Sequence, residues 1–363
     1  MNPPIEVIYI EEGAQASPLC QEVLRRLEGI PTVVLRDAED VHQEIRRSAA
    51  DVFGEGKKRL LLTRFKGSFL KKCPGLSPGM VCCNYYVVNL IKNCIYDCSY
   101  CFLQDFLSNN PLLTAYVNVE DLIRELAETF RAHPGRTFRV GTGELTDSLA
   151  LEEWLPYADH LIPFFHDFPN AALELKTKSD CVESLLQHPA KPNIIISWSL
   201  NPESFAAAEE FGAPGTRQRL DAARRCHEAG YRVGFHFDPI LLFPGWETAY
   251  AELVDDLFAH VPAAGIEWVS LGSFRYRRSL KPIIRQRHPA TRLFASEHVP
   301  AGDGKFRYLR PLRQQAYDAV RDRLQCHAPD LNIYLCMESK EVWENVTGRM
   351  PRADAKLDAF FSL

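Results

Sequence analysis

Three cysteines, Cys94, Cys98 and Cys101, follow one another with the spacing C-x3-C-x2-C. Three thiolates in so short a loop can hold three irons of a cubane [4Fe–4S] cluster and leave the fourth iron open to another ligand. A zinc site is the alternative, but structural zinc takes four closed ligands, usually from C-x2-C pairs. The spacing therefore predicts an iron–sulfur centre with an open metal position. An open position indicates a centre that takes part in a reaction.

Short apolar runs alternate with amphipathic segments after residue 85, and this order positions the cysteines. Strands are expected at Val87–Ile91, Phe138–Val140, Ala172–Leu175, Ile194–Trp198, Arg232–Phe237 and Glu267–Leu271. Helices are expected at Val119–Arg131, Cys181–Gln187, Arg217–Ala229 and Trp246–His260. This alternation predicts an α/β fold with a parallel sheet, a partial or complete (β/α) barrel. The cysteine loop follows its first strand, at the end where such barrels carry active sites.

Three parts of the chain are expected. Residues 1–80 form a small α/β unit and a linker, with strands at Ile5–Ile10, Pro31–Leu35 and Arg59–Arg64. The linker, residues 66–79, is rich in Lys, Gly and Pro. Residues 81–275 form the barrel core, and residues 276–363 form a basic part that we expect to bind substrate.

Composition narrows the class of protein. The 363 residues are 46% hydrophobic and 25% charged, as in an ordinary globular protein. No apolar run is long enough to cross a membrane, and the first residues lack the features of a secretory signal. We therefore expect a cytoplasmic protein, monomeric and not bound to membranes. Its other cysteines, among them Cys73, Cys82 and Cys83, are expected to be reduced, and buried or incidental.

An aromatic residue, Tyr100, stands directly before Cys101 in this loop. With that feature the loop resembles the radical S-adenosylmethionine superfamily. The resemblance implies that the amino and carboxylate groups of S-adenosylmethionine chelate the open iron. Reductive cleavage would then give methionine and a 5′-deoxyadenosyl radical, with electrons from a reducing partner such as flavodoxin or ferredoxin.

More distant segments narrow the resemblance to the spore photoproduct lyase family. They are residues 94–104, 116–118, 182–186 after Lys178, 239–240, 245–247 and, most specific outside the cysteine loop, 281–293. The family splits a methylene-bridged thymine dimer in spore DNA. The resemblance implies a lyase or related radical enzyme that acts on a DNA photoproduct.

The turn Gly141-Thr142-Gly143-Glu144 follows the second barrel strand. The family has a small-residue turn at this place, ending in an acid that receives the amino group of the cosubstrate. Glycines let the backbone approach a ligand closely, and a carboxylate suits an ammonium group. We therefore expect all four residues to bind S-adenosylmethionine.

Four further positions carry over from the family. Lys178 and Ser197 match residues that contact the carboxylate and ribose of the cosubstrate. Tyr100 matches an aromatic residue whose backbone contacts adenine, and we also expect it to be catalytic. Asp238 stands where the family has a small residue near adenine, so its carboxylate is a departure.

Two other departures concern hydrogen-atom transfer. The family returns a hydrogen atom to its product from a cysteine on the second barrel strand, where this chain has Gly141. It also has a tyrosine directly after the third cluster cysteine, where this chain has Phe102. We expect a paralogue in which the substrate, or the fate of the substrate radical, is different. Cysteine at 141 and tyrosine at 102 would be expected to restore clean repair.

Residues 272–323 concentrate positive charge in a chain whose net charge is −5. They contain 13 Lys or Arg against four acids, interleaved with aromatic residues. Such a segment suits a phosphate backbone and an unstacked base. The residues expected to contact nucleic acid are Arg275, Lys281, Lys305, Arg307 and Tyr308; the last three lie in a segment, 300–308, that resembles the family's DNA-wedging hairpin. The alternative is a small-molecule or peptide substrate, favoured by the acidic overall charge.

Overall fold

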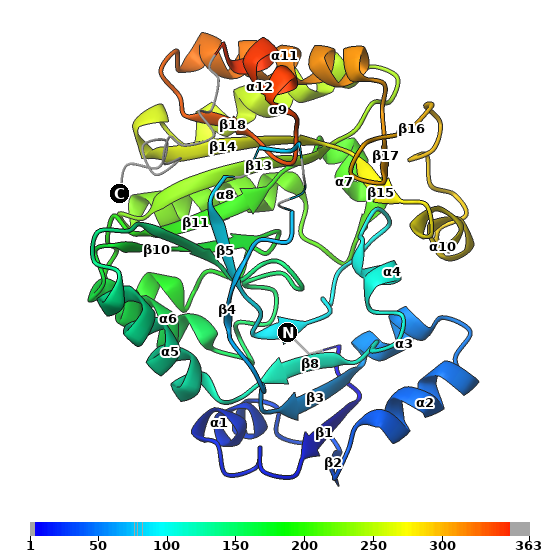
Figure 1. Ribbon diagram of the computed structural model, residues 1–363, viewed down its shortest axis with the longest axis vertical. Helices are drawn as coiled ribbons and strands as arrows, with labels where there is room; N and C mark the ends of the chain where they lie inside the picture. The colour runs from blue at the N-terminus through cyan, green and yellow to red at the C-terminus, as the bar shows by residue number, and fades with distance from the viewer. Residues whose placement is uncertain (1–3, 76, 78, 82, 349–363) are drawn as a thin grey trace.

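A curled sheet dominates the computed structural model, which describes residues 4–348 apart from 76, 78 and 82 (Figure 1). Its eight described strands run in the order β18-β14-β13-β11-β10-β9-β5-β4, and all pair in parallel except β4 with β5. Their bounds are β4 Leu70–Lys72, β5 Tyr85–Val88, β9 Phe138–Gly141, β10 Ala171–Thr177, β11 Ile194–Ser199, β13 Arg232–Ile240, β14 Ile266–Ser273 and β18 Ile333–Leu335. The sheet is a partial barrel, which confirms the predicted fold class.

Helices between the strands cover the outer face of this half-barrel (Figure 1). They are α5 Val119–Ala132, α6 Tyr157–His166, α8 Thr216–Glu228, α9 Trp246–His260, α11 Arg310–His327 and α12 Lys340–Thr347. In α5 the buried side chains Leu122, Leu126 and Phe130 recur every four residues, so one stripe of the helix faces the core. None of the helices in the described ranges has both the length and the apolar content needed to span a bilayer.

A second sheet lies at one end of the half-barrel, with order β2-β1-β3-β8-β6 (Figure 1). Its strands are β1 Val7–Glu11, β2 Thr32–Leu35, β3 Arg59–Thr63, β6 Ile91–Lys92 and β8 Leu113–Tyr116, and its helices are α1 Pro18–Arg26, α2 Glu39–Ser48 and α3 Val52–Lys57. β6 and β8 flank the cysteine loop in sequence. The cysteine loop therefore begins and ends at this sheet. The sheet includes strands beyond residue 80, where we expected the first part of the chain to end.

Two expected elements are different in the structure. The predicted strand Val87–Ile91 divides between the two sheets, because β5 ends at Val88 and β6 begins at Ile91. The predicted helix Cys181–Gln187 contains only a 3-10 turn, Leu185–Gln187. Here the hydroxyl groups of Thr177 and Ser179 accept the backbone N–H groups of Ser179 and Cys181 at 2.8 and 3.0 Å, so local side-chain bonds compete with a helix.

Short elements complete the end of the molecule that carries the cysteines. They are β7 Asp97–Cys98, α4 Leu103–Phe106, α7 Glu203–Glu209, β12 Glu210–Phe211, α10 Leu280–Arg287 and the strands β15 Arg275–Arg277, β16 Val299–Pro300 and β17 Lys305–Arg307. The last two strands form the expected hairpin, which pairs with β15. Helix α10 packs on α4, directly after the cysteines. Cys82 and residues 349–363 of the predicted C-terminal part lie outside the described residues.

Candidate active site

The three cysteines lie on one loop between β6 and α4. Cys94 and Cys101 pack against Phe53 and Leu145, and Cys98 is only 8% exposed. Burial raises the pKa of the Cys94 thiol to about 12 and also raises the pKa of Cys98 and Cys101. Bound metal would have to supply the positive charge that turns these thiols into thiolates.

The described residues hold no group of three or more His, Cys, Asp or Glu side chains arranged around a single metal ion. A cubane cluster has a different requirement, because each of its cysteines binds a separate iron. Thiol donors suit iron–sulfur clusters. The set formed by Cys94, Cys98 and Cys101 therefore fits a cluster with three protein ligands.

Lys57, at the end of α3, supports the cysteine loop from the side of the second sheet. Its ammonium donates to the carbonyl oxygens of Cys94, at 3.0 Å, and of Tyr96. It also lies 3.2 Å from a carboxylate oxygen of Asp97. Lys57 was not predicted as a site residue, because a lysine more than thirty residues before the cysteines gives no signal of this contact.

Arg287, at the end of α10, supports the loop from a second helix. Its guanidinium donates to Asp97 at 2.9 Å, to Asp51 at 2.8 Å and to the side-chain oxygen of Gln104 at 2.6 Å. Gln104 in turn donates to the carbonyl oxygens of Ser99 and Cys101, at 2.8 and 3.1 Å. Arg287 lies in segment 281–293, so this segment acts by bracing the loop.

Lys57 and Arg287 act on the same carboxylate. Burial alone would raise the pKa of Asp97, but these two cations hold it below its usual range. Asp97 is therefore ionised and links both cations to the peptide that joins Cys94 to Cys98.

A third contact comes from the chain that follows β11. The pair Glu210–Phe211 forms β12 and runs antiparallel to β7, with Glu210 opposite Cys98. The hydroxyl of Tyr100 donates to the carboxylate of Glu210, and Arg219 forms a buried ion pair with that carboxylate at 2.5 Å. The phenol that we expected to be catalytic is thus held by Glu210.

Lys178 lies beside this group, at the end of β10. Its ammonium is 5.6 Å from the centre of the Tyr100 ring. Burial opposes its charge, but Glu210 and Cys98 raise the pKa of Lys178 overall. The structure therefore brings Lys178 to the cysteine loop, as its predicted place in the cosubstrate site requires.

The turn Gly141–Glu144 follows β9 and approaches β10 closely. A Cβ atom on Gly143 would lie 3.0 Å from the carbonyl oxygen of Lys176 and 3.0 Å from the hydroxyl of Ser148, so only glycine fits well. Thr142 donates to Ser148 at 2.8 Å. Glu144 accepts a 2.7 Å hydrogen bond from Asn89, between β5 and the cysteine loop, and burial raises the pKa of Glu144.

Asp147 connects this turn to Lys178, and the sequence analysis missed it. Its carboxylate accepts the backbone N–H of Lys178 at 2.6 Å and the hydroxyl of Thr177 at 2.6 Å. It also accepts the N–H groups of Leu149 and Ala150, at 3.0 and 2.9 Å. Asp147 therefore fixes the ends of two strands relative to one another.

Ser197 lies deeper than the other predicted cosubstrate contacts. Its side chain is fully buried and its hydroxyl donates to Glu174 at 2.7 Å. The same carboxylate accepts hydrogen bonds from Arg139 at 2.8 Å, His236 at 2.8 Å and Trp268 at 3.2 Å. In this structure Ser197 belongs to a polar layer inside the barrel; its contact with a ribose stays a prediction.

Asp238, the expected departure near adenine, forms an ion pair with Arg275. The guanidinium donates to both carboxylate oxygens, at 2.9 and 3.1 Å. Burial alone would raise the pKa of Asp238, but Arg275 and Lys176 hold it well below its usual range. The pair places two opposite charges near the carboxyl end of β13. It also engages Arg275, a residue that we expected to contact nucleic acid.

Part of the basic segment is internal, including two of the residues that we expected to contact nucleic acid. Arg307 and Tyr308 are each 1% exposed, and Arg307 is paired with Asp303. A buried guanidinium that already has a carboxylate partner cannot also reach a phosphate from this position. Lys281 and Lys305 are partly exposed, whereas the well-exposed cations nearby are Arg277, Arg278, Arg285 and Arg292.

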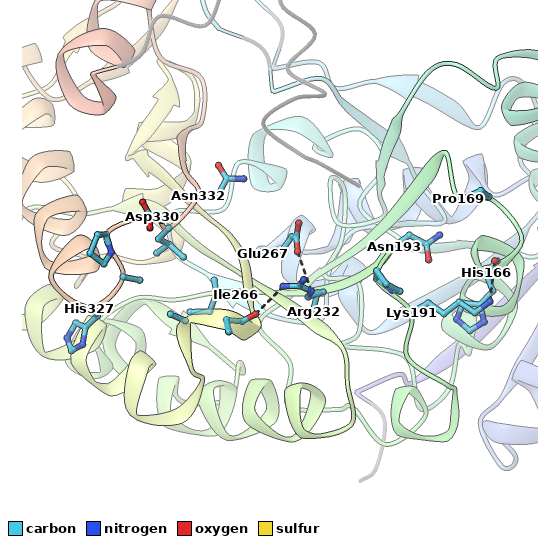
Figure 2. Close-up of a pocket in the computed structure, with 16 residues that line it drawn as sticks. His166, Pro169, Lys191, Asn193, Arg232, Ile266, Glu267, His327, Asp330 and Asn332 are labelled. Carbon is cyan, nitrogen blue, oxygen red and sulfur yellow. Dashed lines mark hydrogen bonds and ion pairs between the residues drawn. The ribbon is translucent and has the colours of Figure 1, made fainter.

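A hollow of about 890 Å³ opens at the opposite end of the half-barrel (Figure 2). Asn193, Arg232, Ile266 and Asn332, which line it, lie at the amino-terminal ends of their strands. Arg232 there lies 3.6 Å from a carboxylate oxygen of Glu267. Parallel barrels carry their chemistry at the other end, so we assign this hollow no part in the active site.

A parallel half-barrel with a C-x3-C-x2-C loop braced beside its rim defines a radical S-adenosylmethionine enzyme. The sequence model of the spore photoproduct lyase family matches residues 4–327. The chain belongs to the spore photoproduct lyase family.

Characterised relatives are distant in sequence. Spore photoproduct lyase from Geobacillus sp. is 27% identical over 256 residues, which cover 68% of this chain and 75% of the relative. Spore photoproduct lyase from Bacillus subtilis is 23% identical over 341 residues, which cover 90% of this chain and 97% of the relative.

Solved structures share the fold. A variant of spore photoproduct lyase with bound S-adenosylmethionine and dinucleoside spore photoproduct superimposes with a TM-score of 0.79, at 22% identity, over 92% of this chain and 99% of that one. Spore photoproduct lyase complexed with the dinucleoside alone gives a TM-score of 0.79 at 22% identity, over 91% of this chain and 98% of that one. At this identity the likeness establishes the fold.

Proposed function

We propose that Cys94, Cys98 and Cys101 hold a [4Fe–4S] cluster whose open iron binds S-adenosylmethionine. The observation that carries the proposal is that three separate elements, α3, α10 and β12, hold the cysteine loop beside the turn 141–144 and Lys178. When bound, the cluster supplies the electron that cleaves the cosubstrate. The protein holds the loop with Lys57 and Arg287 and offers a carboxylate, Glu144, for the amino group of the cosubstrate.

Other residues would complete the cosubstrate pocket. Lys178 suits the carboxylate of S-adenosylmethionine, since an ammonium and a carboxylate attract one another. The backbone of residues 141–143 can approach the ligand closely because two of the three are glycine. Tyr100 and Asp238 would lie near adenine, as the family resemblance implies, and Ser197 would contact the ribose from the barrel interior.

We propose that the substrate is a thymine photoproduct in DNA. Two findings support this proposal. The chain belongs to the spore photoproduct lyase family, and related solved structures contain dinucleoside spore photoproduct. The exposed cations Arg277, Arg278, Arg285 and Arg292 lie in or soon after β15 and α10 and suit a phosphate backbone. The internal pairing of the other cations leaves less free charge for DNA, and this favours a small-molecule or peptide substrate as the second candidate.

The test is an anaerobic assay of reconstituted enzyme with dinucleoside spore photoproduct and with an oligonucleotide that contains it. We expect repaired thymine and 5′-deoxyadenosine, and salt-dependent retention of the oligonucleotide. A matched control is Cys101→Ala, which should give neither product. Formation of 5′-deoxyadenosine without repaired thymine, and without retention of DNA at low salt, would support the second candidate instead.

A further inference from the structure

The space beside Gly141 is filled by another side chain. A Cβ atom on Gly141 would overlap the hydroxyl oxygen of Tyr85 and lie 3.0 Å from its ring atom Cε1. In the family the side chain at this position is the cysteine that returns a hydrogen atom. The phenol of Tyr85 therefore stands where that cysteine side chain would begin.

Tyr85 reaches this place from the neighbouring strand. Its backbone pairs with Arg139, two residues before Gly141, so the side chain runs along the barrel interior toward the carboxyl rim. The Arg139 guanidinium lies 5.0 Å from the centre of the Tyr85 ring and orients it. Tyr85 stays partly exposed, and its hydroxyl reaches the first residue of the turn 141–144.

The phenol also keeps its proton. Burial raises the pKa of Tyr85 well above its usual range, and Glu174 raises it further. An O–H group that stays protonated at working pH carries the hydrogen atom that a carbon radical needs.

We propose that Tyr85 donates the hydrogen atom that quenches the substrate radical, in place of the thiol that Gly141 lacks. This inference rests on the proposed function, because it requires a carbon radical on the substrate at the rim of the barrel. It assigns to Tyr85 a chemical role that the family gives to a different residue type on a different strand.

The O–H bond of Tyr85 breaks, a C–H bond forms on the substrate, and Tyr85 becomes a neutral phenoxyl radical. One electron from the low-potential donor that also reduces the cluster, together with one proton from solvent, restores the phenol. Phe102 offers no phenol for a relay back to 5′-deoxyadenosine, so each product consumes one S-adenosylmethionine.

The experiment compares native enzyme with Tyr85→Phe on dinucleoside spore photoproduct, under anaerobic conditions and with excess reductant. In the variant we expect clean repaired product to fall by at least about tenfold, because the donor is lost, while 5′-deoxyadenosine from the first turnover stays within about twofold. Freeze-quenched native enzyme should show a tyrosyl radical by electron paramagnetic resonance, and Tyr85→Phe should not.

Two matched controls separate this role from others. Tyr86→Phe alters the next tyrosine, whose hydroxyl pairs with Arg136, and should keep both product and radical signal. Cys83→Ala removes a thiol near Tyr85 and should do the same. Clean repair by Tyr85→Phe at the native rate, or its loss in Cys83→Ala alone, would overturn the inference. Absence of 5′-deoxyadenosine from native enzyme would contradict the proposed function as well.

Discussion

At the scale of single residues, the structure shows what lies beside Gly141, the position where the family has a cysteine. The sequence analysis treated the position as a missing thiol that could be restored. The structure shows that the space beside Gly141 is occupied by the phenol of Tyr85, so a side chain at position 141 would require Tyr85 to move. Spacing along the chain could not reveal this, because the two residues lie on neighbouring strands and are 56 positions apart.

Gly141→Cys alone should destabilise the protein, in contrast to the expectation that the fold would accept it. Inserting a side chain against Tyr85 forces strain that typically costs about 1–3 kcal/mol in a packed interior. Gly141→Cys combined with Tyr85→Ala should recover part of that loss. Urea denaturation of both variants measures the difference, and equal stability of Gly141→Cys and native protein would show that Tyr85 moves aside freely.

Glu144→Gln should weaken S-adenosylmethionine binding by about 1.5–3 kcal/mol, since a charge-assisted hydrogen bond is lost. Burial raises the pKa of Glu144, so the native affinity should fall as pH drops through that raised value and the carboxylate is protonated. The variant should not show this pH dependence. Equilibrium binding across pH checks both points, with exposed Glu120→Gln as the control; unchanged affinity would remove Glu144 from the pocket.

At the scale of elements, the cysteine loop is stable because elements far apart in sequence meet on it. Helix α3 supplies Lys57, α10 supplies Arg287, and β12 pairs with β7. Strand and helix patterns predicted the barrel strands but not these four short elements. The contacts among them could not be predicted, because 2- and 3.6-residue periodicities report which face is buried and not which partner covers it.

Arg287→Gln should loosen the loop and lower the amount of cluster that the protein retains. The variant loses hydrogen bonds to Asp51 and Asp97, a cost of about 1–3 kcal/mol for charged groups left without a partner. Iron content after reconstitution and gel filtration measures the effect. Arg292→Gln, at an exposed position on the same segment, should retain the native iron content; equal iron in both variants would contradict the bracing role.

At the scale of the whole molecule, polar residues from several strands form one layer inside the half-barrel. Glu174 is fully buried and accepts hydrogen bonds from Arg139, Ser197, His236 and Trp268. Breaking such a network leaves a buried charge without a partner, so the layer fixes how the strands lie relative to one another. The alternation of strands and helices predicted the barrel but not this layer, because its members appear in sequence as isolated residues.

The candidate site, like the fold, could be predicted from the sequence only in part. Barrel topology predicted that the cysteine loop and the turn 141–144 lie at one rim, and the family resemblance added Lys178; the ligands of these residues stay predictions. Arg307 and Tyr308, which we expected to contact DNA, are both buried in this structure, and their contact with DNA stays a prediction. A run of cations does not show which of them have carboxylate partners from distant elements, as Arg307 has in Glu338.

The central claim is that Cys94, Cys98 and Cys101 hold a cluster that cleaves S-adenosylmethionine. The most direct test reconstitutes native protein, the triple Ala variant of these cysteines and Cys326→Ala under anaerobic conditions, then adds reductant and S-adenosylmethionine. We predict about four irons per chain and 5′-deoxyadenosine from native protein and Cys326→Ala, and neither from the triple variant. A full cluster in the triple variant, or stoichiometric zinc with no 5′-deoxyadenosine in native protein, would contradict the account.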